Sequence, residues 1–291
     1  MNTAKVVVIG SGHNSERFIK ENINNHYIKV IGSIPDGALN SCDYKEYELL
    51  LKKCDIGFTL GYSKIIPSII CDQYFIVNLH AGILPKWRGF SANAWAIMNG
   101  EKEIGYSLHR VTSTLDGGAL YYVKRIPIEE EQTMSDVYGV MIDSIVNDCP
   151  EMLYKIANNI YISERQKCTE ITYCTRFYAQ MGNLRSFNME AQYYVNLYRC
   201  MAKPLGSGIS FWHKGEKFNV GKIKNGIKYG VAKYICNEGR IVNIENNTLW
   251  VKVKDSVIIL AEIRKDDGKE VRLEKYFKNG QLLSDNGELY E

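Results

Sequence analysis

Short apolar runs alternate with helix-like segments over the first third of the chain, and this alternation restricts the folds that it can adopt. Residues 6–9 (VVVI) are continuously apolar, and similar runs occur in "YIKVIGSI", "DIGFTLGY" and "YFIVNLHA". Segments such as "YKEYELLLKK", which lie between them, have helical character. Strands that alternate with helices are typical of a mostly parallel sheet covered by helices. We therefore expect an α/β, Rossmann-like domain.

The remaining two thirds of the chain predict added strands, a helix and a second domain. The stretch "GYSLHRVTSTLDGGALYYVKRIPI" is rich in β-formers, and Thr133 and Asp136 then have the spacing of a capping box that begins a helix. We expect Pro150 to kink or restart that helix. From residue 205, short β-runs alternate with Gly, Asn and Asp turns, which is typical of a small barrel. The predicted domains are a catalytic domain over 1–190, a helical linker over 191–204 and a β-barrel over 205–291.

Composition excludes some classes of protein. A net charge of +3 and 45% hydrophobic residues are ordinary for a soluble chain and argue against a dedicated nucleic-acid binder. We find no apolar run of roughly 18 residues, the length that suggests a membrane-spanning helix. The eight cysteines are scattered without a C-x-x-C pair, and we interpret them as reduced thiols of a cytoplasmic protein.

The stretch "NLHAGILPKWRG" places polar residues where an apolar strand runs out. Asn78 and His80 are two residues apart, so on a strand they point to the same face. In open α/β sheets, ligands bind beyond the carboxyl ends of the strands. Taken alone, the pair is equally compatible with a functional site and with purely structural roles, in which His80 is a structural histidine and Asn78 forms a turn.

Three ordered motifs remove part of this ambiguity. An Asn-x-His pair, a Leu-Pro-x-x-Arg-Gly loop and the later "LDGGAL" resemble the N10-formyltetrahydrofolate-dependent formyltransferases, over most of residues 1–200. The resemblance implies that Asn78, His80 and Asp116 are catalytic. Two departures stand out: Gly82 replaces the usual Ser, and Asp116 begins Asp-Gly-Gly-Ala instead of Asp-Thr-Gly-Asp.

The resemblance also implies a mechanism, in which an amine attacks the formyl carbon of N10-formyltetrahydrofolate. Asn78 would donate an N–H to the developing oxyanion, which is an effective use of a preorganised donor. His80 would stabilise the same oxyanion or carry a proton. Asp116 would orient the imidazole and help to accept the proton of the amine. Whether His80 or Asp116 is the formal base stays open.

By the same resemblance, two groups of residues would surround the substrates, and no metal is expected. The folate cosubstrate would contact an apolar set, although without the family Tyr62 and Ile65 are ordinary core or surface residues. The folate set comprises Tyr62, Ile65, Ile66, Leu84 and Leu115. Lys86 and Arg88 would meet a diphosphate, for which a planar guanidinium and a point charge are both suited; a solvated loop is the alternative for Lys86. The other residues on the substrate side are Phe90, His109 and the turn Gly12, His13 and Asn14, which lacks the third glycine of a dinucleotide fingerprint.

The identity of the acceptor is predicted from the stretch "NAWAIMNGEKEIGYSLHR". With Trp95 before "NGE" and His109 after it, this stretch resembles the sugar branch of the family. That branch implies a nucleotide-linked amino sugar, dTDP-4-amino-4,6-dideoxyglucose, in the synthesis of bacterial surface polysaccharide such as O-antigen, by a cytoplasmic homodimer. The tail from residue 205 resembles the OB-like domain of methionyl-tRNA formyltransferase and of some sugar formyltransferases. Methionyl-tRNA formyltransferase and a non-enzymatic nucleotide-binding regulator are the alternatives.

Overall fold

The computed structural model describes residues 3–40 and 44–283 and divides the chain into two compact units. The first unit comprises the residues up to Ala96, Lys102–Ile128 and Tyr138–Arg176; the second comprises Ile97–Glu101, Glu129–Val137 and the chain from Phe177. The second unit therefore begins before the predicted boundary at residue 190. The reason is strand β9 (Asn183–Leu184), which pairs with β10 (Ile209–His213) of the second unit.

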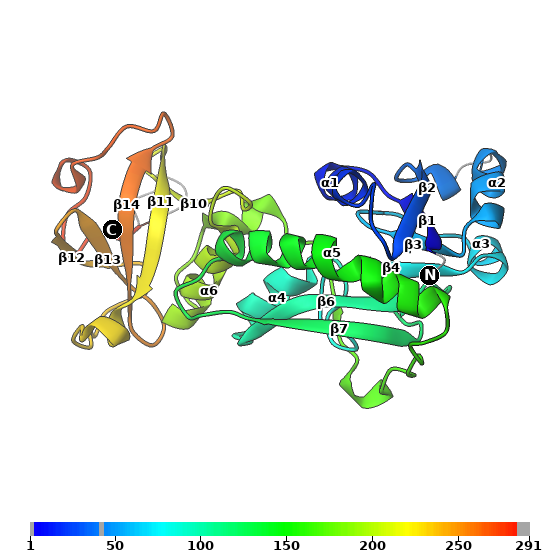
Figure 1. The fold of residues 1–291 in the computed structure, drawn as a ribbon. Coiled ribbons are helices and arrows are strands. Elements are labelled where there is room, and N and C mark those ends of the chain that lie inside the picture. Colours follow the sequence, from blue (N-terminus) through cyan, green and yellow to red (C-terminus); the bar gives the residue numbers. More distant parts are fainter. Residues whose placement is uncertain (1–2, 41–43, 284–291) are drawn as a thin grey trace. The chain divides into compact units, whose positions relative to one another are not determined.

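The first unit contains a six-stranded sheet in the order β2-β1-β3-β4-β6-β7. The pairs β1–β2, β1–β3 and β3–β4 are parallel, and β6 and β7 are added antiparallel, so the sheet is mostly parallel and Rossmann-like as predicted (Figure 1). Its strands are β1 (Ala4–Ile9), β2 (Ile28–Ile34), β3 (Ile56–Thr59), β4 (Ile76–His80), β6 (Glu103–Arg110) and β7 (Leu120–Pro127).

The apolar strands of this sheet are buried because helices cover it. Val7, Ile9, Ile34 and Ile76, for example, are all fully buried in one cluster, as expected of strands with both faces covered. The other elements of this part of the chain are α1 (His13–Glu21), the 3-10 turn Ala38–Asn40, α2 (Lys45–Lys53), α3 (Ser68–Gln73), β5 (Arg88–Gly89), α4 (Ala92–Met98), the 3-10 turn Cys168–Glu170 and β8 (Tyr173–Cys174).

Helix α5 (Met134–Ala157) begins at the predicted capping box. The Thr133 N–H donates to the Asp136 carboxylate at 2.7 Å, and the Asp136 N–H donates back to Thr133 Oγ1 at 3.3 Å. Pro150 lies inside a single helix, so the expected restart does not occur. The Tyr106 hydroxyl of β6 lies 3.0 Å from Ser144 Oγ of α5, which joins the helix to the sheet.

The second unit contains another six-stranded sheet, in the order β12-β13-β14-β11-β10-β9, which is the second β domain that the sequence predicted. All of its pairs are antiparallel except β9–β10. The remaining elements are the 3-10 turn Ala179–Gly182, α6 (Ala191–Met201), β11 (Glu216–Asn225), the 3-10 turn Gly226–Tyr229, β12 (Ile241–Glu245), β13 (Thr248–Lys252), β14 (Val257–Lys265) and the 3-10 turn Leu273–Lys275. Helix α6 occupies most of the predicted linker.

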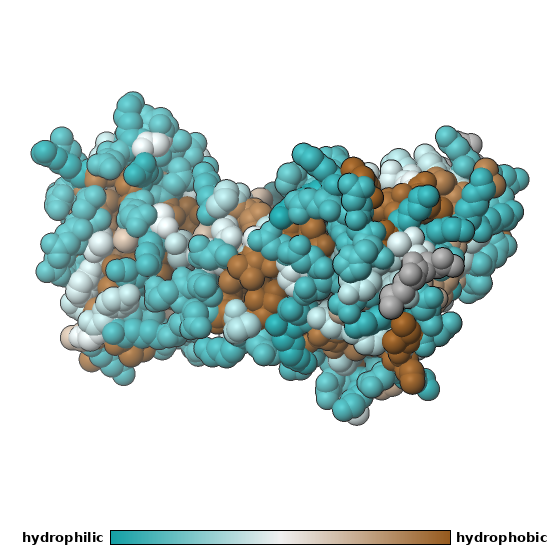
Figure 2. Space-filling model, in the orientation of Figure 1, coloured by the Kyte–Doolittle hydropathy of each residue, from teal (hydrophilic) through white to brown (hydrophobic). Residues whose placement is uncertain are grey.

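Hydrophilic residues cover most of the face shown in Figure 2, and apolar residues form separate patches on it. Across residues 3–40 and 44–283, no helix combines the length and apolar character needed to cross a membrane. The seven cysteines within residues 3–40 and 44–283 form no disulfide, and Cys42 lies outside the described residues.

Candidate active site

Strand pairing brings the first candidate residues together at the carboxyl end of β4. Asn78 is paired with Thr59 of β3 on one side and with His109 of β6 on the other. His80, two residues further along β4, is paired with Ser107. The polar end of one apolar strand is thus flanked by polar side chains from both neighbours.

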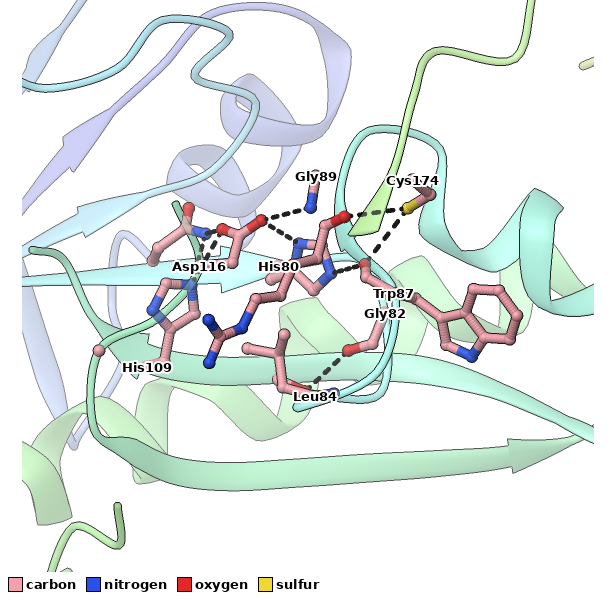
Figure 3. A network of polar contacts seen from close by, with 12 residues as sticks. His80, Gly82, Leu84, Trp87, Gly89, His109, Asp116 and Cys174 are labelled. Carbon is pink, nitrogen blue, oxygen red and sulfur yellow. Dashed lines mark hydrogen bonds and ion pairs between the residues drawn. The ribbon is translucent and has the colours of Figure 1, made fainter. Parts of the chain in front are cut away.

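Asp116 reaches this cluster from the loop between β6 and β7. Its backbone is left-handed, with φ of 46°, a conformation that Asp and Asn tolerate better than most residues. Asp116 Oδ2 accepts a hydrogen bond from the Gly89 N–H at 2.8 Å and lies 3.4 Å from His80 Nδ1. Asp116 Oδ1 lies 3.3 Å from His109 Nε2 (Figure 3). The structure therefore places all three predicted catalytic residues in one network, with His109 as a fourth member.

Burial and charge oppose one another at the two central groups. Burial lowers the pKa of His80, although the neighbouring Asp116 charge works in the opposite direction. Burial alone would raise the pKa of Asp116, but its contacts with His109, His80 and the Gly89 N–H bring it below the ordinary value. At neutral pH the site thus contains a carboxylate beside a neutral imidazole.

Hydrogen-bond directions show where this site can accept a proton. His80 Nε2 lies 2.9 Å from the Trp87 carbonyl, which can only accept, so Nε2 carries the proton. His80 Nδ1 is then unprotonated and faces the Asp116 carboxylate, so two acceptors lie 3.4 Å apart. A proton that arrives here is stabilised by both groups, because it turns two opposed lone pairs into a charge-assisted hydrogen bond.

The amide of Asn78 is oriented by contacts on both of its ends. The Thr59 hydroxyl donates to Asn78 Oδ1, and His109 Nε2 lies 2.9 Å from Asn78 Nδ2. His109 Nδ1 lies 2.9 Å from the Arg110 carbonyl, so it carries the proton and Nε2 accepts. The second N–H of Asn78 points at Asp116 Oδ1 over a long 3.4 Å. This weakly held donor is free to turn to an oxygen that develops negative charge.

A cavity of about 630 Å³ opens onto this network. Its lining is mostly apolar and includes Asn78, His80, His109 and Asp116. Five further residues predicted from the sequence also line it: Tyr62, Ile65, Ile66, Phe90 and Leu115. A cavity with an apolar wall and a few convergent polar groups is typical of a small-molecule site.

Three other predicted residues of the motif loop lie outside this lining. Leu84 is buried, and its N–H donates to Ser107 Oγ at 3.1 Å. Lys86 is exposed. Arg88 is only 4% exposed, and its guanidinium donates twice to Gln166 Oε1, at 3.2 and 2.7 Å. The Arg88 guanidinium is therefore bound inside the protein instead of facing a diphosphate.

The predicted turn Gly12, His13 and Asn14 also lies outside the lining. It forms the start of α1, where Gly12 and His13 are exposed. The Asn14 side chain donates to the Tyr138 hydroxyl at 2.6 Å, so it joins α1 to α5.

Packing explains why the usual serine is a glycine at position 82. A Cβ atom on Gly82 would lie 2.5 Å from the Ala92 Cβ and 2.6 Å from His80 Nε2. Both distances are shorter than non-bonded contacts allow. The position of the His80 ring in this protein thus depends on the absence of a side chain at residue 82.

Sequence reasoning missed two residues of the network. Thr59 ends β3 and is 2% exposed, and Gln166 follows α5 and is 7% exposed. For Thr59 the sequence did offer a signal, because a hydroxyl residue at the end of an apolar strand repeats the pattern of Asn78, with which Thr59 is paired. Gln166 belongs to no motif.

The residues that the structure describes contain no group of three or more His, Cys, Asp or Glu able to hold a metal ion.

Comparison with known proteins places this geometry in a family. Residues 44–147 match the formyl transferase domain, and residues 183–281 match the formyl transferase C-terminal domain. The methionyl-tRNA formyltransferase of Caldanaerobacter subterraneus subsp. tengcongensis is 26% identical over 83% of this chain and 76% of its own length.

Solved structures agree on the fold. An N-formyltransferase from Helicobacter canadensis, in complex with folinic acid and dTDP-3-aminofucose, has a TM-score of 0.66 at 18% identity, over 90% of this chain and 100% of its own. HypX from Aquifex aeolicus, in complex with tetrahydrofolic acid, has a TM-score of 0.63 at 14% identity over 91% of this chain, which spans only 45% of HypX. Two domain matches that together span more than two thirds of the chain, on a fold that carries Asn78, His80 and Asp116 at one cavity, show that this protein belongs to the formyl transferase family.

Proposed function

We propose that this formyltransferase moves the formyl group of N10-formyltetrahydrofolate to the amino group of a nucleotide-linked amino sugar. The observation that carries the proposal is the joining of the Asn78, His80 and Asp116 network to a cavity of about 630 Å³ with an apolar wall. A folate offers a flat aromatic body to such a wall and presents its formyl group at one point.

The chain's residues divide the work of the transfer. Asn78 turns its weakly held N–H from Asp116 Oδ1 to the formyl oxygen as the amine attacks, and such a donor contributes about 3 kcal/mol to the transition state. The amine nitrogen gains positive charge and must lose a proton. His80 Nδ1 and Asp116 Oδ2 take up that proton between them, so the pair is the base. The pair then returns the proton to N10 as the bond between N10 and the formyl carbon breaks, and tetrahydrofolate leaves.

The folate donor is supported by the apolar residues of the cavity. Tyr62, Ile65, Ile66 and Leu115 line it, and Ile65 and Leu115 are 68% and 42% exposed. Exposed apolar side chains at the mouth of a cavity are stabilised when a flat ligand covers them. The folate and the tetrahydrofolate bound to two proteins of similar fold agree with this assignment.

A nucleotide-linked amino sugar is supported on the acceptor side. The Helicobacter canadensis structure holds dTDP-3-aminofucose. The stretch of this chain that contains Trp95 and His109 resembles the sugar branch of the family. Arg88 is bound to Gln166, so we assign the diphosphate contact to Arg176, which is exposed and lies with its guanidinium 4.5 Å from the Phe90 ring centroid. Phe90 itself lines the cavity. We propose dTDP-4-amino-4,6-dideoxyglucose as the sugar and a homodimer as the active form, C2 dimers being the commonest oligomers.

Methionyl-tRNA is the second candidate acceptor, because a methionyl-tRNA formyltransferase is similar along 83% of the chain. A side-by-side rate comparison decides between the two. It measures tetrahydrofolate release with dTDP-4-amino-4,6-dideoxyglucose, its 3-amino isomer, the UDP and GDP analogues and methionyl-tRNA. The proposal expects the dTDP-sugar to react fastest, and a faster rate with methionyl-tRNA refutes the sugar assignment. Release with none of these acceptors refutes both.

A further inference from the structure

We propose that Gln166 is a positioning residue that holds the catalytic loop of Asp116, with Arg88 as its partner. The inference rests on the proposed use of Asp116 in formyl transfer. Gln166 lies between α5 and β8, 50 residues after Asp116 in the chain, and no sequence motif contains it.

Both N–H groups of the Gln166 amide bind the backbone on either side of Gly117. Nε2 donates to the carbonyls of Asp116 and Gly118, each at 2.8 Å. Asp116 has a left-handed backbone, which needs support from its surroundings. The two hydrogen bonds provide this support at the residue whose carboxylate touches His80.

Arg88 fixes which end of the Gln166 amide faces that loop. A guanidinium can only donate, and Arg88 Nε and Nη2 both donate to Gln166 Oε1, so the oxygen of the amide points to Arg88. The nitrogen must then point to Asp116. At 7% exposure, Gln166 thus has a partner for its oxygen and for both of its N–H groups.

These contacts close a ring of interactions around the active site. Arg88 is followed in the chain by Gly89, whose N–H binds the Asp116 carboxylate at 2.8 Å. The ring runs from Gly89 to the Asp116 side chain, from the Asp116 carbonyl to Gln166, and from Gln166 back to Arg88. A closed ring resists displacement of any one member more than a single hydrogen bond does.

Backbone contacts anchor the segment that carries Gln166 at both ends. Leu120 and Glu164 exchange two N–H···O hydrogen bonds of 2.8 Å. On the other side, β8 pairs with β5, with Arg88 opposite Tyr173 and Gly89 opposite Cys174. Gln166 is therefore a fixed point against which the Asp116 loop can be held.

The test compares Gln166→Leu, which removes all of these hydrogen bonds, with Asn93→Leu as a control. Asn93 is an equally buried amide of the same unit that accepts from and donates to Gly105, and it does not contact Asp116. We expect Gln166→Leu to lower kcat by about tenfold to a hundredfold, because a displacement of about 1 Å costs up to that much, with the KM for folate changing less than kcat. Asn93→Leu is expected to lower thermal stability without lowering kcat more than it changes the KM for folate.

A ¹³C NMR titration of the Asp116 carboxyl gives a readout that does not depend on activity. Asp116 faces His80 and Asn78 from β4, the Gly89 N–H from β5, His109 from β6 and Cys174 from β8. An Asp116 carboxylate that moves away from the Gly89 N–H loses a hydrogen bond that lowers its pKa, so the pKa of Asp116 rises in Gln166→Leu and stays in place in Asn93→Leu.

Gln166→Glu is the second variant, in case the leucine variant does not fold. It keeps the pairing with Arg88 but opposes the two carbonyl oxygens with a carboxylate, so it is expected to shift the Asp116 titration in the same direction. An unchanged Asp116 titration in the folded variant overturns the positioning role. If the wild-type protein transfers formyl to no acceptor, the proposed function fails, and the titration still decides the role of Gln166.

Discussion

Gly89 donates its backbone N–H to the Asp116 carboxylate at 2.8 Å, which joins the Leu-Pro-x-x-Arg-Gly loop to the loop that carries Asp116. The residue must be a glycine, because its φ is 102° and a Cβ would lie 2.3 Å from the Cys174 carbonyl oxygen. The loop that supplies Gly89 also supplies the Trp87 carbonyl that fixes the tautomer of His80. One loop thus orients both members of the proton-accepting pair.

Replacing Asp116 by Asn separates the charge of this side chain from its shape. Asn tolerates the left-handed backbone and can still accept from the Gly89 N–H, so the fold should persist. The proton acceptor next to His80 is lost, and we expect kcat to fall by about a hundredfold to ten-thousandfold. Initial rates of tetrahydrofolate release measure this, with circular dichroism as the check on folding. A variant that retains more than about a tenth of kcat would show that the carboxylate is not part of the base.

Restoring the serine that is usual in the family at position 82 is predicted to damage this protein. The added Cβ meets the Ala92 Cβ and His80 Nε2 at 2.5 and 2.6 Å, so either the His80 ring or the backbone around residue 82 must shift. We expect Gly82→Ser and Gly82→Ala to lower kcat alike, by about tenfold or more, because the ring and not the hydroxyl matters. Steady-state kinetics of both variants test this.

Gly139→Ala is the matched control for the glycine series. Gly139 is an exposed residue of α5, and a Cβ there would meet nothing within 4 Å. This substitution should leave kcat unchanged and stabilise the protein by about 0.5–1 kcal/mol, because alanine favours the helix. A fully active Gly82→Ser variant would contradict the packing argument.

The three residues that we propose as catalytic could be predicted from the sequence, whereas the residues that hold them could not. Asn78 and His80 end an apolar strand, and the two-residue period of a strand puts them on one face. Gln166 gives no such signal, because its contacts join segments about fifty residues apart through the side chain of a single amide. Arg88 shows the same limit: a motif identifies the arginine, but only the packing of the 164–176 segment decides that its guanidinium points inward.

The fold, like the site, was predictable from the sequence only in part. Hydrophobic runs predicted the parallel sheet, since burial on both faces leaves its strands continuously apolar. The boundary near residue 190 was less predictable, because β9 is two residues long and its partner lies about 25 residues further on. Pro150 failed to break α5, which shows that packing on the sheet overrides a local preference.

Because His213 is buried, we predict that the second unit loses stability at low pH. Burial lowers the pKa of this histidine, and its Nδ1 is a buried atom without a hydrogen-bond partner. In the folded protein His213 therefore stays neutral, whereas in the unfolded chain the same imidazole takes up a proton at its ordinary pKa. The contribution to stability is intact above the ordinary value of 6.5 and is lost as the pH falls below it.

Hydrogen exchange measures this effect in β10 and β11, expressed as protection factors at pH 7.5 and 5.5. We expect lower protection at pH 5.5, and a smaller difference between the two pH values in His213→Phe, which keeps an aromatic ring against Phe277. Equal pH dependence in the two proteins would rule out His213 as the source. His80 also has a lowered pKa, so exchange within the second unit is needed to separate the two histidines.

Arg176 provides the last prediction, which concerns the acceptor. Its guanidinium lies over the Phe90 ring, and Phe90 lines the cavity, so the charge lies beside the mouth of the site. Arg176→Leu should raise the KM for a dTDP-sugar by about tenfold, which corresponds to one charge-assisted hydrogen bond, while the KM for folate changes by less than about twofold. Raising the salt concentration should narrow the gap between wild type and variant, because salt screens the exposed charge. Arg125→Leu is the control, since Arg125 is an exposed arginine of the same unit that pairs with Glu103 on the sheet. If Arg125→Leu and Arg176→Leu raise the KM for the dTDP-sugar equally, the effect reflects net charge and the diphosphate contact lies elsewhere.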